Sequence, residues 1–185
     1  MLKTLEKAIS EKFLFKPYSK NYPKLFLKEK KLLSKALSSI EKKEVHHIGS
    51  TSVPGLGGKG VIDVIVIVEK KKVSLVKKLL KKAKFNYHHT MGKRSFYQKY
   101  YVDGKKIPRL IHLHLTFFGS GEKEKALMFR DYLISHPKEK KQYSLLKKKA
   151  SSLHSSNGLK YAKFKYNFIV KILKKAQEKQ AKLKK

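Results

Sequence analysis

Hydrophobic residues recur along this chain in two spacings, one typical of strands and one typical of helices. Residues 61–68 are apolar and mostly β-branched except for one acid, which predicts a central strand buried on both faces. Residues 25–40 carry apolar side chains at helical spacing, which predicts an amphipathic helix. Further helices are predicted at residues 73–83, 121–135, 137–153 and 159–179, and further strands at residues 44–48, 85–88, 95–102 and 107–118.

The order of these elements predicts an α+β fold in which a mixed β-sheet is covered by helices, with helices also at the C-terminal end. A length of 185 residues and an apolar content of 41% fit a single domain over residues 1–185 with a real core. The Asp103-Gly104 pair predicts a hairpin turn between the last two strands. Residues 174–185 are rich in lysine, which predicts a solvated basic tail.

A turn rich in glycine and serine follows the first predicted strand. Gly49 and Ser50 open it, and successive backbone N–H groups with one hydroxyl suit the binding of a phosphate. A second interpretation is that Ser50, Thr51 or Ser52 caps a short helix. Caps and phosphate sites share one geometry, so the two interpretations are compatible.

One acid, Asp63, lies inside the predicted central strand. A buried carboxylate needs a partner, such as a metal ion, a cation or a proton. One hypothesis makes Asp63 a catalytic residue that holds a metal ion against a phosphate. The alternative is a structural acid paired with Arg94, Arg109 or Lys59.

Several ordered blocks in this chain resemble the GrpB family, a branch of the polymerase-β-like nucleotidyltransferases. The most specific block is HIGSTSVPGL at residues 47–56, followed by Ile62-Asp63. The resemblance covers roughly residues 17 to 173. Its other blocks are YSKNYPKLF at residues 18–26, HLHL at 112–115, FRDYL at 129–133, and Tyr161, Lys165 and Phe168-Ile169 near the end.

This resemblance implies a nucleotidyltransferase-like core that binds a nucleoside triphosphate together with Mg²⁺ or Mn²⁺. Active members of the superfamily carry two acids in a D-x-D pair and a third acid on a later strand. This chain has Ile65 at the second position and offers His112 and His114 on the later strand. This chain therefore has one of the three acids that two-metal catalysis uses, and the alternative is a single ion held by Asp63, His114 and a substrate phosphate.

Histidines and arginines supply further candidates. His112 and His114 are two residues apart on one strand, so they share a face and suit a metal pair, a phosphate-binding pair or plain polar roles. Of the adjacent His46 and His47, at most one faces the site, and we expect it to be His47. Because this chain uses lysine almost everywhere, its three arginines are expected at positions that need the planar, bidentate guanidinium group.

Arg130 and Asp131 are neighbours on a predicted helix, where adjacent side chains diverge and are not expected to bind each other well. Arg130 is a candidate for phosphate binding and Asp131 for an ion pair, and a purely structural network is the alternative. Lys165 shares a helix face with two aromatic residues that are expected to pack on the sheet. The predicted phosphate-binding residues are Gly49, Ser50, Thr51, Lys59, Arg94, Arg109, Arg130 and Lys165.

The charge is extreme, because 46 Lys and Arg residues face 13 Asp and Glu residues and give a net charge of +33. Such a field attracts nucleic acid, anionic membranes or polyphosphate, although a coding bias toward lysine would produce part of it. The absence of cysteine excludes disulfides. The sequence has no apolar run of about 18 residues, so no membrane span is predicted. Residues 1–12 lack the apolar core of a secretory signal, and we therefore expect a cytoplasmic protein.

Two functional hypotheses follow. The first is an enzyme that binds a nucleoside triphosphate and transfers a nucleotidyl group to a polyanionic acceptor such as RNA. The second is a catalytically degenerate module that keeps the pocket and binds a nucleotide, a phosphate or a nucleic acid. Attachment of the basic C-terminal helix to anionic membranes is a third, weaker alternative. The sequence leaves the nucleotide, the acceptor and the oligomeric state open.

Overall fold

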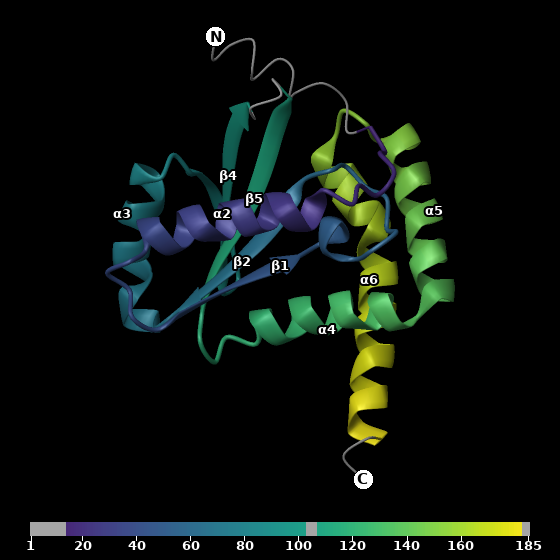
Figure 1. The fold of residues 1–185 in the computed structure, drawn as a ribbon. Coiled ribbons are helices and arrows are strands. Elements are labelled where there is room, and N and C mark those ends of the chain that lie inside the picture. The colour runs from purple at the N-terminus through teal and green to yellow at the C-terminus, as the bar shows by residue number, and fades with distance from the viewer. Residues whose placement is uncertain (1–13, 103–106, 183–185) are drawn as a thin grey trace.

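The computed structural model describes residues 14–102 and 107–182, which form a five-stranded β-sheet with helices on both faces (Figure 1). The strand order across the sheet is β1-β2-β5-β4-β3. β2 and β5 are parallel, and the other neighbouring pairs are antiparallel. The predicted α+β class with a mixed sheet is confirmed. The strands are β1 (Lys43–Ile48), β2 (Ile62–Val68), β3 (Asn86–Met91), β4 (Arg94–Val102) and β5 (Pro108–Phe117).

β2 is a central strand, as predicted, because it pairs with β1 on one side and with β5 on the other. Every residue of β2 except Asp63 is buried. Its even-numbered residues face one layer of helices, and its odd-numbered residues, including Asp63, face the other. The single acid of the strand therefore lies on a defined face of the sheet.

The helices divide between the two faces of the sheet (Figure 1). α2 (Tyr22–Ala36) and α3 (Val73–Lys82) pack on the face of the even-numbered β2 residues. α4 (Glu122–Ser135) packs on the opposite face. α5 (Pro137–Leu153) and α6 (Gly158–Lys182) pack together with α4 and with the loop between β1 and β2. That loop therefore lies where the sheet meets the C-terminal helices.

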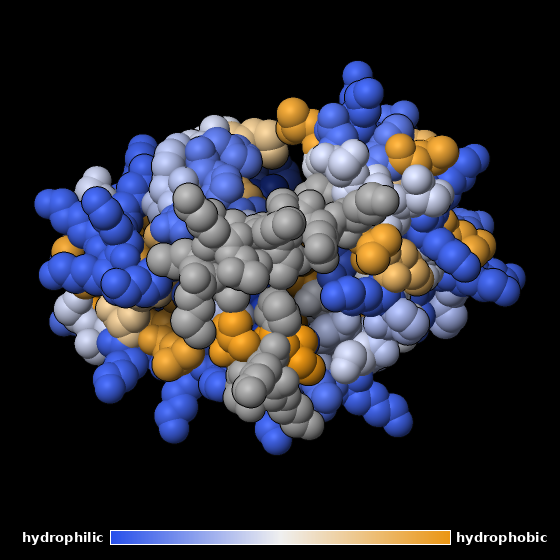
Figure 2. Space-filling model, turned by 90° about the horizontal axis from the view of Figure 1, so that it is seen from above, coloured by the Kyte–Doolittle hydropathy of each residue, from blue (hydrophilic) through white to orange (hydrophobic). Residues whose placement is uncertain are grey.

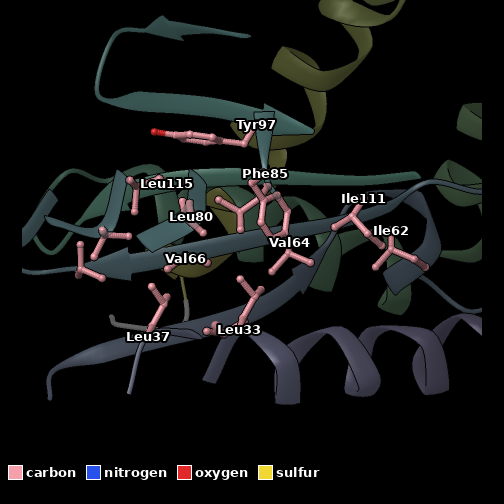
Figure 3. Close-up of a cluster of buried hydrophobic side chains, with 14 of the residues drawn as sticks. Leu33, Leu37, Ile62, Val64, Val66, Leu80, Phe85, Tyr97, Ile111 and Leu115 are labelled. Atoms are coloured by element: carbon pink, nitrogen blue, oxygen red, sulfur yellow. The ribbon is translucent and has the colours of Figure 1, made fainter. Parts of the chain in front are cut away.

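The main core lies between the sheet and the α2–α3 layer. Figure 3 shows Leu33 and Leu37 directed from the α2 side toward Val64 and Val66 of β2. Phe85, which precedes β3, is buried in the same cluster. Burial of such side chains is the main force that holds the helices on the sheet.

The first helix begins and ends earlier than its hydrophobic pattern predicts. Residues 25–40 were the predicted range, whereas α2 spans Tyr22–Ala36, with Pro23 in its first turn. Proline fits the first turn of a helix because its missing N–H has no partner there. Leu37 and Ile40 lie beyond the helix but are still buried, so the apolar pattern continues past the helix end.

The predicted strand at residues 85–88 is shifted in the structure. β3 spans Asn86–Met91, its side chains are exposed, and its pairing with β4 is irregular between Tyr87 and His89. This edge strand has no buried face that would show as alternation in the sequence. β4 and β5 pair as an antiparallel hairpin, as predicted, and the Asp103-Gly104 turn lies outside the described residues.

α6 continues to Lys182, so residues 174–182 of the predicted basic tail are helical, and residues 177–182 are exposed. Ile172 and Ala176 are buried. These two residues are four positions apart, so they share a helix face among many lysines. The charged N-terminal segment at residues 1–12 lies outside the described residues. Within residues 14–102 and 107–182, no helix is long and apolar enough to cross a membrane.

Candidate functional site

The turn after β1 is shaped by the side chains of Asp63 and Ser50. Gly49 has φ 71° and ψ −168°, a conformation that is essentially restricted to glycine. A Cβ atom at Gly49 would overlap the carboxylate of Asp63, and a Cβ atom at Gly58 would overlap the Ser50 hydroxyl. Gly49 therefore allows the loop to lie directly against the acid of β2, and Gly58 leaves room for the Ser50 side chain.

Asp63 is held by two histidines of the neighbouring strand. In the parallel pairing of β2 with β5, Asp63 lies opposite His112, and His114 shares the same face of β5. Asp63 Oδ1 is 3.2 Å from His112 Nδ1 and 4.0 Å from His114 Nε2. Burial favours a neutral carboxyl, but the interactions with these histidines outweigh it and hold the pKa of Asp63 well below its usual range. Asp63 is therefore ionised.

A cleft of about 730 Å³ opens beside Asp63, between the sheet, the loop and the C-terminal helices. This volume falls in the range of small-molecule sites. The sheet and the loop contribute Gly49, Ser50, Lys59, Val61, Asp63, His89, Met91, Phe96, Gln98 and His112, and the helices with their connection contribute Tyr143, Lys147, Ser156, Asn157, Gly158, Leu159, Tyr161, Ala162 and Lys165.

Three lysines reach this cleft from three different elements. Lys59 comes from the loop, Lys147 from α5 and Lys165 from α6. The Nζ atoms of Lys59 and Lys165 lie 3.9 Å and 4.3 Å from the centre of the Tyr161 ring. Lys147 is only 2% exposed, and its ammonium group donates a hydrogen bond to the Gly57 carbonyl. The cleft is thus a site of concentrated positive charge.

The burial of these lysines weakens their hold on a proton. Burial lowers the pKa of Lys59 and of Lys147 to about 7, and the charge of Lys165 lowers both further. Burial also lowers the pKa of Lys165 to about 8. Asp63 acts in the opposite direction on all three, because a nearby negative charge favours the ammonium form.

Several predicted site residues do not line the cleft, in the part of the chain that the structure describes. His47 faces α2, where its ring stacks on Phe26 at 4.6 Å between ring centres. Burial lowers the pKa of His47 to about 4. Thr51 is buried and donates a hydrogen bond to the Val61 carbonyl, and it also lies 2.9 Å from His47 Nε2. These two residues hold the loop in place.

None of the three arginines lines the cleft, in this same described part of the chain. Arg94 is 3.5 Å from Glu122 and, together with His114, borders an adjoining hollow of about 180 Å³. Arg109 is two residues before Ile111 on β5, so both side chains point to the face of the sheet that α2 covers. The predicted ion pair of Asp63 with an arginine is therefore replaced by its contacts with two histidines.

Arg130 and Asp131 bind each other, contrary to the prediction from helix geometry. Arg130 Nε donates to Asp131 Oδ1 at 2.7 Å, and its Nη1 donates to the His47 carbonyl at 3.0 Å. The long, flexible arginine side chain spans the angular offset between adjacent helical positions. This pair connects α4 to β1 and matches the structural alternative.

Lys147 is a site residue that the sequence did not single out. It is buried and shares one face of α5 with Tyr143 and Ala150. The available signal was a lysine at a core-facing position of an amphipathic helix, four residues after Tyr143. In a chain with so many lysines, this signal is easily overlooked.

A family model described as GrpB protein matches residues 14–175 of this chain. The chain belongs to the GrpB family. A GrpB relative, the glutamate-rich protein GrpB of Alkalihalophilus pseudofirmus, is 29% identical over 84% of this chain and 91% of its own length. The UPF0157 protein YqkA of Bacillus subtilis is 30% identical over 82% of this chain, but this chain covers only 43% of that relative.

Solved structures of a GrpB protein and of a poly(U) polymerase share the fold of this chain. The conserved protein GrpB from Enterococcus faecalis superposes with a TM-score of 0.76 at 31% identity, over 90% of this chain and 99% of that one. A mutant of the Cid1 poly(U) polymerase bound to MgATP superposes with a TM-score of 0.51 at 13% identity, over 78% of this chain and 46% of that one. This chain therefore has a nucleotidyltransferase-like fold.

The metal ions implied by the GrpB resemblance meet a limited set of ligands. Within residues 14–102 and 107–182, no three His, Cys, Asp or Glu side chains are grouped to hold a metal ion. Asp63 Oδ1 is directed to histidines, and Oδ2 lies against Gly49. Mg²⁺ prefers oxygen ligands, and a two-metal centre needs more carboxylates. These residues do not fit a two-metal centre, and they fit at most one ion that arrives with substrate phosphates.

Proposed function

We propose that this GrpB-family protein binds a nucleoside triphosphate in the cleft. The phosphates would lie against the Gly49-Ser50 turn and the ammonium groups of Lys59, Lys147 and Lys165. The convergence of these three lysines on one cleft carries the proposal. Ammonium groups and backbone N–H groups are the donors that phosphate oxygens accept most strongly. A structural neighbour with the same fold, the Cid1 poly(U) polymerase, is bound to MgATP.

Thermal unfolding with each of the four ribonucleoside triphosphates tests this function, in the presence of Mg²⁺ or Mn²⁺. A ligand at about 100 times its dissociation constant stabilises the folded protein by about 2.7 kcal/mol, so the melting temperature is expected to rise. Changing Lys165→Gln is expected to weaken binding about tenfold or more, because a charge-assisted hydrogen bond contributes about 1.5–3 kcal/mol. Failure of all four nucleotides to shift the transition would contradict the proposal.

A matched control separates the cleft from the general lysine surface. Lys163 is on the same helix as Lys165 but is exposed and does not line the cleft. Lys163→Gln removes the same charge from the protein, so it is expected to leave nucleotide affinity within about twofold of the unchanged protein. Equal losses in both variants would mean that nucleotides bind to diffuse surface charge.

Binding of the triphosphate is expected to weaken as the pH rises from 7 to 9. The ammonium forms of Lys59, Lys147 and Lys165 bind phosphate, and their pKa values of about 7, 7 and 8 mean that they lose protons in this interval. Asp63 stays ionised throughout, and burial raises the pKa of Tyr161 to about 12, so neither group changes charge. We expect a loss of affinity of about tenfold or more, since one unit of pH changes a single titrating group's proton occupancy by up to tenfold.

Calorimetry in buffers of different ionisation enthalpy checks this pH dependence, because bound phosphate would draw protons onto the lysines. Proton uptake near pH 8 is the expected result. The stability of the ligand-free protein should change with pH in the opposite direction to the affinity. The folded pKa values of these lysines lie below the unfolded value, so the unfolded chain binds more protons and their contribution to stability rises with pH above 7. An affinity that is constant from pH 7 to 9 would contradict the lysines' role.

Nucleotidyl transfer to a polyanionic acceptor such as RNA is the second candidate function. The ionised carboxylate of Asp63 at the cleft favours it, as does the net charge of +33. In Figure 2 hydrophilic side chains project around the outline of the molecule, where a polyanion could make contact. Asp63, with His114 and substrate phosphates, would hold one Mg²⁺ or Mn²⁺. A bound ion there would stabilise negative charge on the reacting phosphate.

Transfer is tested by incubating the protein with labelled nucleotide, RNA and Mg²⁺ or Mn²⁺. The salt concentration is that of the cytoplasm, the compartment that we propose for this protein. Attachment of label to RNA would establish the enzyme. Nucleotide binding without any transfer would instead support the catalytically degenerate module. RNA binding to the lysine surface in either case is expected to weaken steeply with salt, because phosphate contacts release counterions.

A further inference from the structure

The charges that line the cleft are the reverse of those in a carboxylate-based metal centre. Lys59, Lys147 and Lys165 supply three groups that are cationic when protonated, and Asp63 is the single acid among the described residues that line the cleft. In a metal centre, carboxylates hold divalent cations and these cations hold the phosphates. Here cationic side chains of the protein itself already lie where the phosphates would bind.

We propose that Lys59, Lys147 and Lys165 bind the triphosphate chain directly, so that the ligand is the metal-free triphosphate anion and no divalent cation is needed for binding. This inference rests on the proposed function, because it concerns the same cleft. It goes further by naming the form of the ligand and by assigning to lysines the charge neutralisation that metal ions provide in metal-dependent transfer.

The placement of the lysines suits direct contact with an anion. They reach the cleft from the loop, from α5 and from α6, so three separate elements bring their charges to one ligand site. The Gly57 carbonyl fixes the Lys147 ammonium group, and the face of Tyr161 lies within 4.3 Å of the other two. An aromatic face attracts cations and holds them in position. Groups held in this way lose little freedom when the ligand binds.

The two histidines beside Asp63 weaken its repulsion of the ligand. His112 Nδ1 is 3.2 Å from Asp63 Oδ1, and His114 lies on the same side. Hydrogen bonds from imidazole spread and partly offset the negative charge of the carboxylate. The repulsion between Asp63 and the ligand is therefore weak.

A divalent cation would not strengthen the binding of the triphosphate to these three lysines. It would bring two further positive charges close to three ammonium groups, and like charges at short range in a partly buried site repel strongly. It would also cancel part of the negative charge of the triphosphate, which weakens its attraction to the lysines. The free anion should therefore bind at least as tightly as its magnesium complex.

Isothermal titration with inorganic triphosphate and with ATP tests this inference, once in EDTA and once in excess Mg²⁺ at fixed ionic strength. We expect binding in EDTA that is as tight as in Mg²⁺ or tighter. Binding that occurs only with Mg²⁺ would overturn the inference and leave the proposed function standing. Failure of both probes to bind in either condition would overturn both. Metal-free binding of inorganic triphosphate without ATP would support the inference and contradict the nucleotide as ligand.

Variants distinguish direct lysine binding from binding through a metal. In EDTA, Lys147→Gln and Lys165→Gln are each expected to weaken inorganic triphosphate binding about tenfold or more. Asp63→Asn removes the one negative charge of the cleft, so it is expected to tighten this binding. Loss of binding in Asp63→Asn would overturn the inference, because it is the result expected for a metal held by the carboxylate.

The neighbouring lysine of α5 provides the matched control. Lys148 is exposed and does not line the cleft, whereas Lys147 is 2% exposed. Lys148→Gln is expected to leave the affinity for inorganic triphosphate unchanged. This result would show that the loss of one positive charge from the protein does not by itself weaken binding. Circular dichroism and the melting temperature confirm that each variant is folded. Equal effects at the two positions would overturn the assignment of Lys147.

Discussion

Gly49→Ala is expected to destabilise the protein by about 2–4 kcal/mol and to abolish ligand binding in the cleft. Two costs add at this position. The backbone conformation is one that only glycine adopts readily, which costs about 1–3 kcal/mol for any other residue. The new methyl group would also overlap the Asp63 carboxylate, so the turn would have to move away from β2 and its backbone N–H groups away from the phosphates. Denaturant unfolding measures the first effect, and triphosphate titration measures the second.

Gly119→Ala is the matched control for this substitution. Gly119 also has a positive φ, of 80°, but a Cβ atom there would meet nothing within 4 Å. It therefore carries the backbone cost without the overlap with Asp63. We expect a loss of about 1 kcal/mol in stability and no loss of triphosphate binding. If both alanine variants bind the ligand normally, the close packing of the loop against Asp63 is not needed for the site.

Asp63→Asn is expected to abolish any nucleotidyl transfer while the protein stays folded. A neutral amide cannot hold a divalent cation as a carboxylate does, so metal-dependent chemistry would stop. We also expect a loss of about 1–3 kcal/mol in stability at pH 7, because His112 and His114 lose an ionised acceptor. Single-turnover transfer assays and denaturant unfolding at pH 7 measure the two effects.

The stability effect of Asp63→Asn has a defined pH dependence. The folded pKa of Asp63 is depressed, so the ionised carboxylate stabilises the fold above its unfolded pKa, about 4. That contribution is lost as the pH falls through the depressed folded pKa. The variant and the unchanged protein should therefore differ most near neutral pH and converge in strong acid. Asp131→Asn, which alters an exposed pair with Arg130, is the control and should cost about 1 kcal/mol or less. Transfer that survives in Asp63→Asn would remove Asp63 from the chemistry.

Local sequence patterns predicted the central part of the fold well. The strand at β2, the hairpin of β4 and β5, and the helices α3 to α6 all followed from hydrophobic periodicity and turn residues. These elements have one or two buried faces, so their pattern is written in consecutive residues. The exposed edge strand β3 lacks such a face, and its boundaries were correspondingly shifted.

Part of the candidate site was also visible in the sequence. Gly49, Ser50, Lys59, Asp63 and Lys165 were predicted, and the structure brings all five to one cleft. The shared face of His112 and His114 followed from strand geometry. What binds in the cleft stays a prediction.

The remaining site residues depended on contacts between distant segments. Arginine identity suggested Arg94, Arg109 and Arg130, but sheet parity and helix packing direct them elsewhere. Lys147 looked like one lysine among many until the packing of α5 against the loop placed it 2% exposed beside Gly57.

The sequence by itself determined the GrpB family, the α+β class and the juxtaposition of a glycine turn with a strand-borne acid, because these are encoded by neighbouring residues. Only the tertiary structure decided which charges surround that acid. The parallel pairing of β2 with β5 sets two histidines beside Asp63, and the packing of α5 and α6 brings two lysines from positions far along the chain. Such encounters depend on strand register and helix packing, which no local spacing of residues specifies.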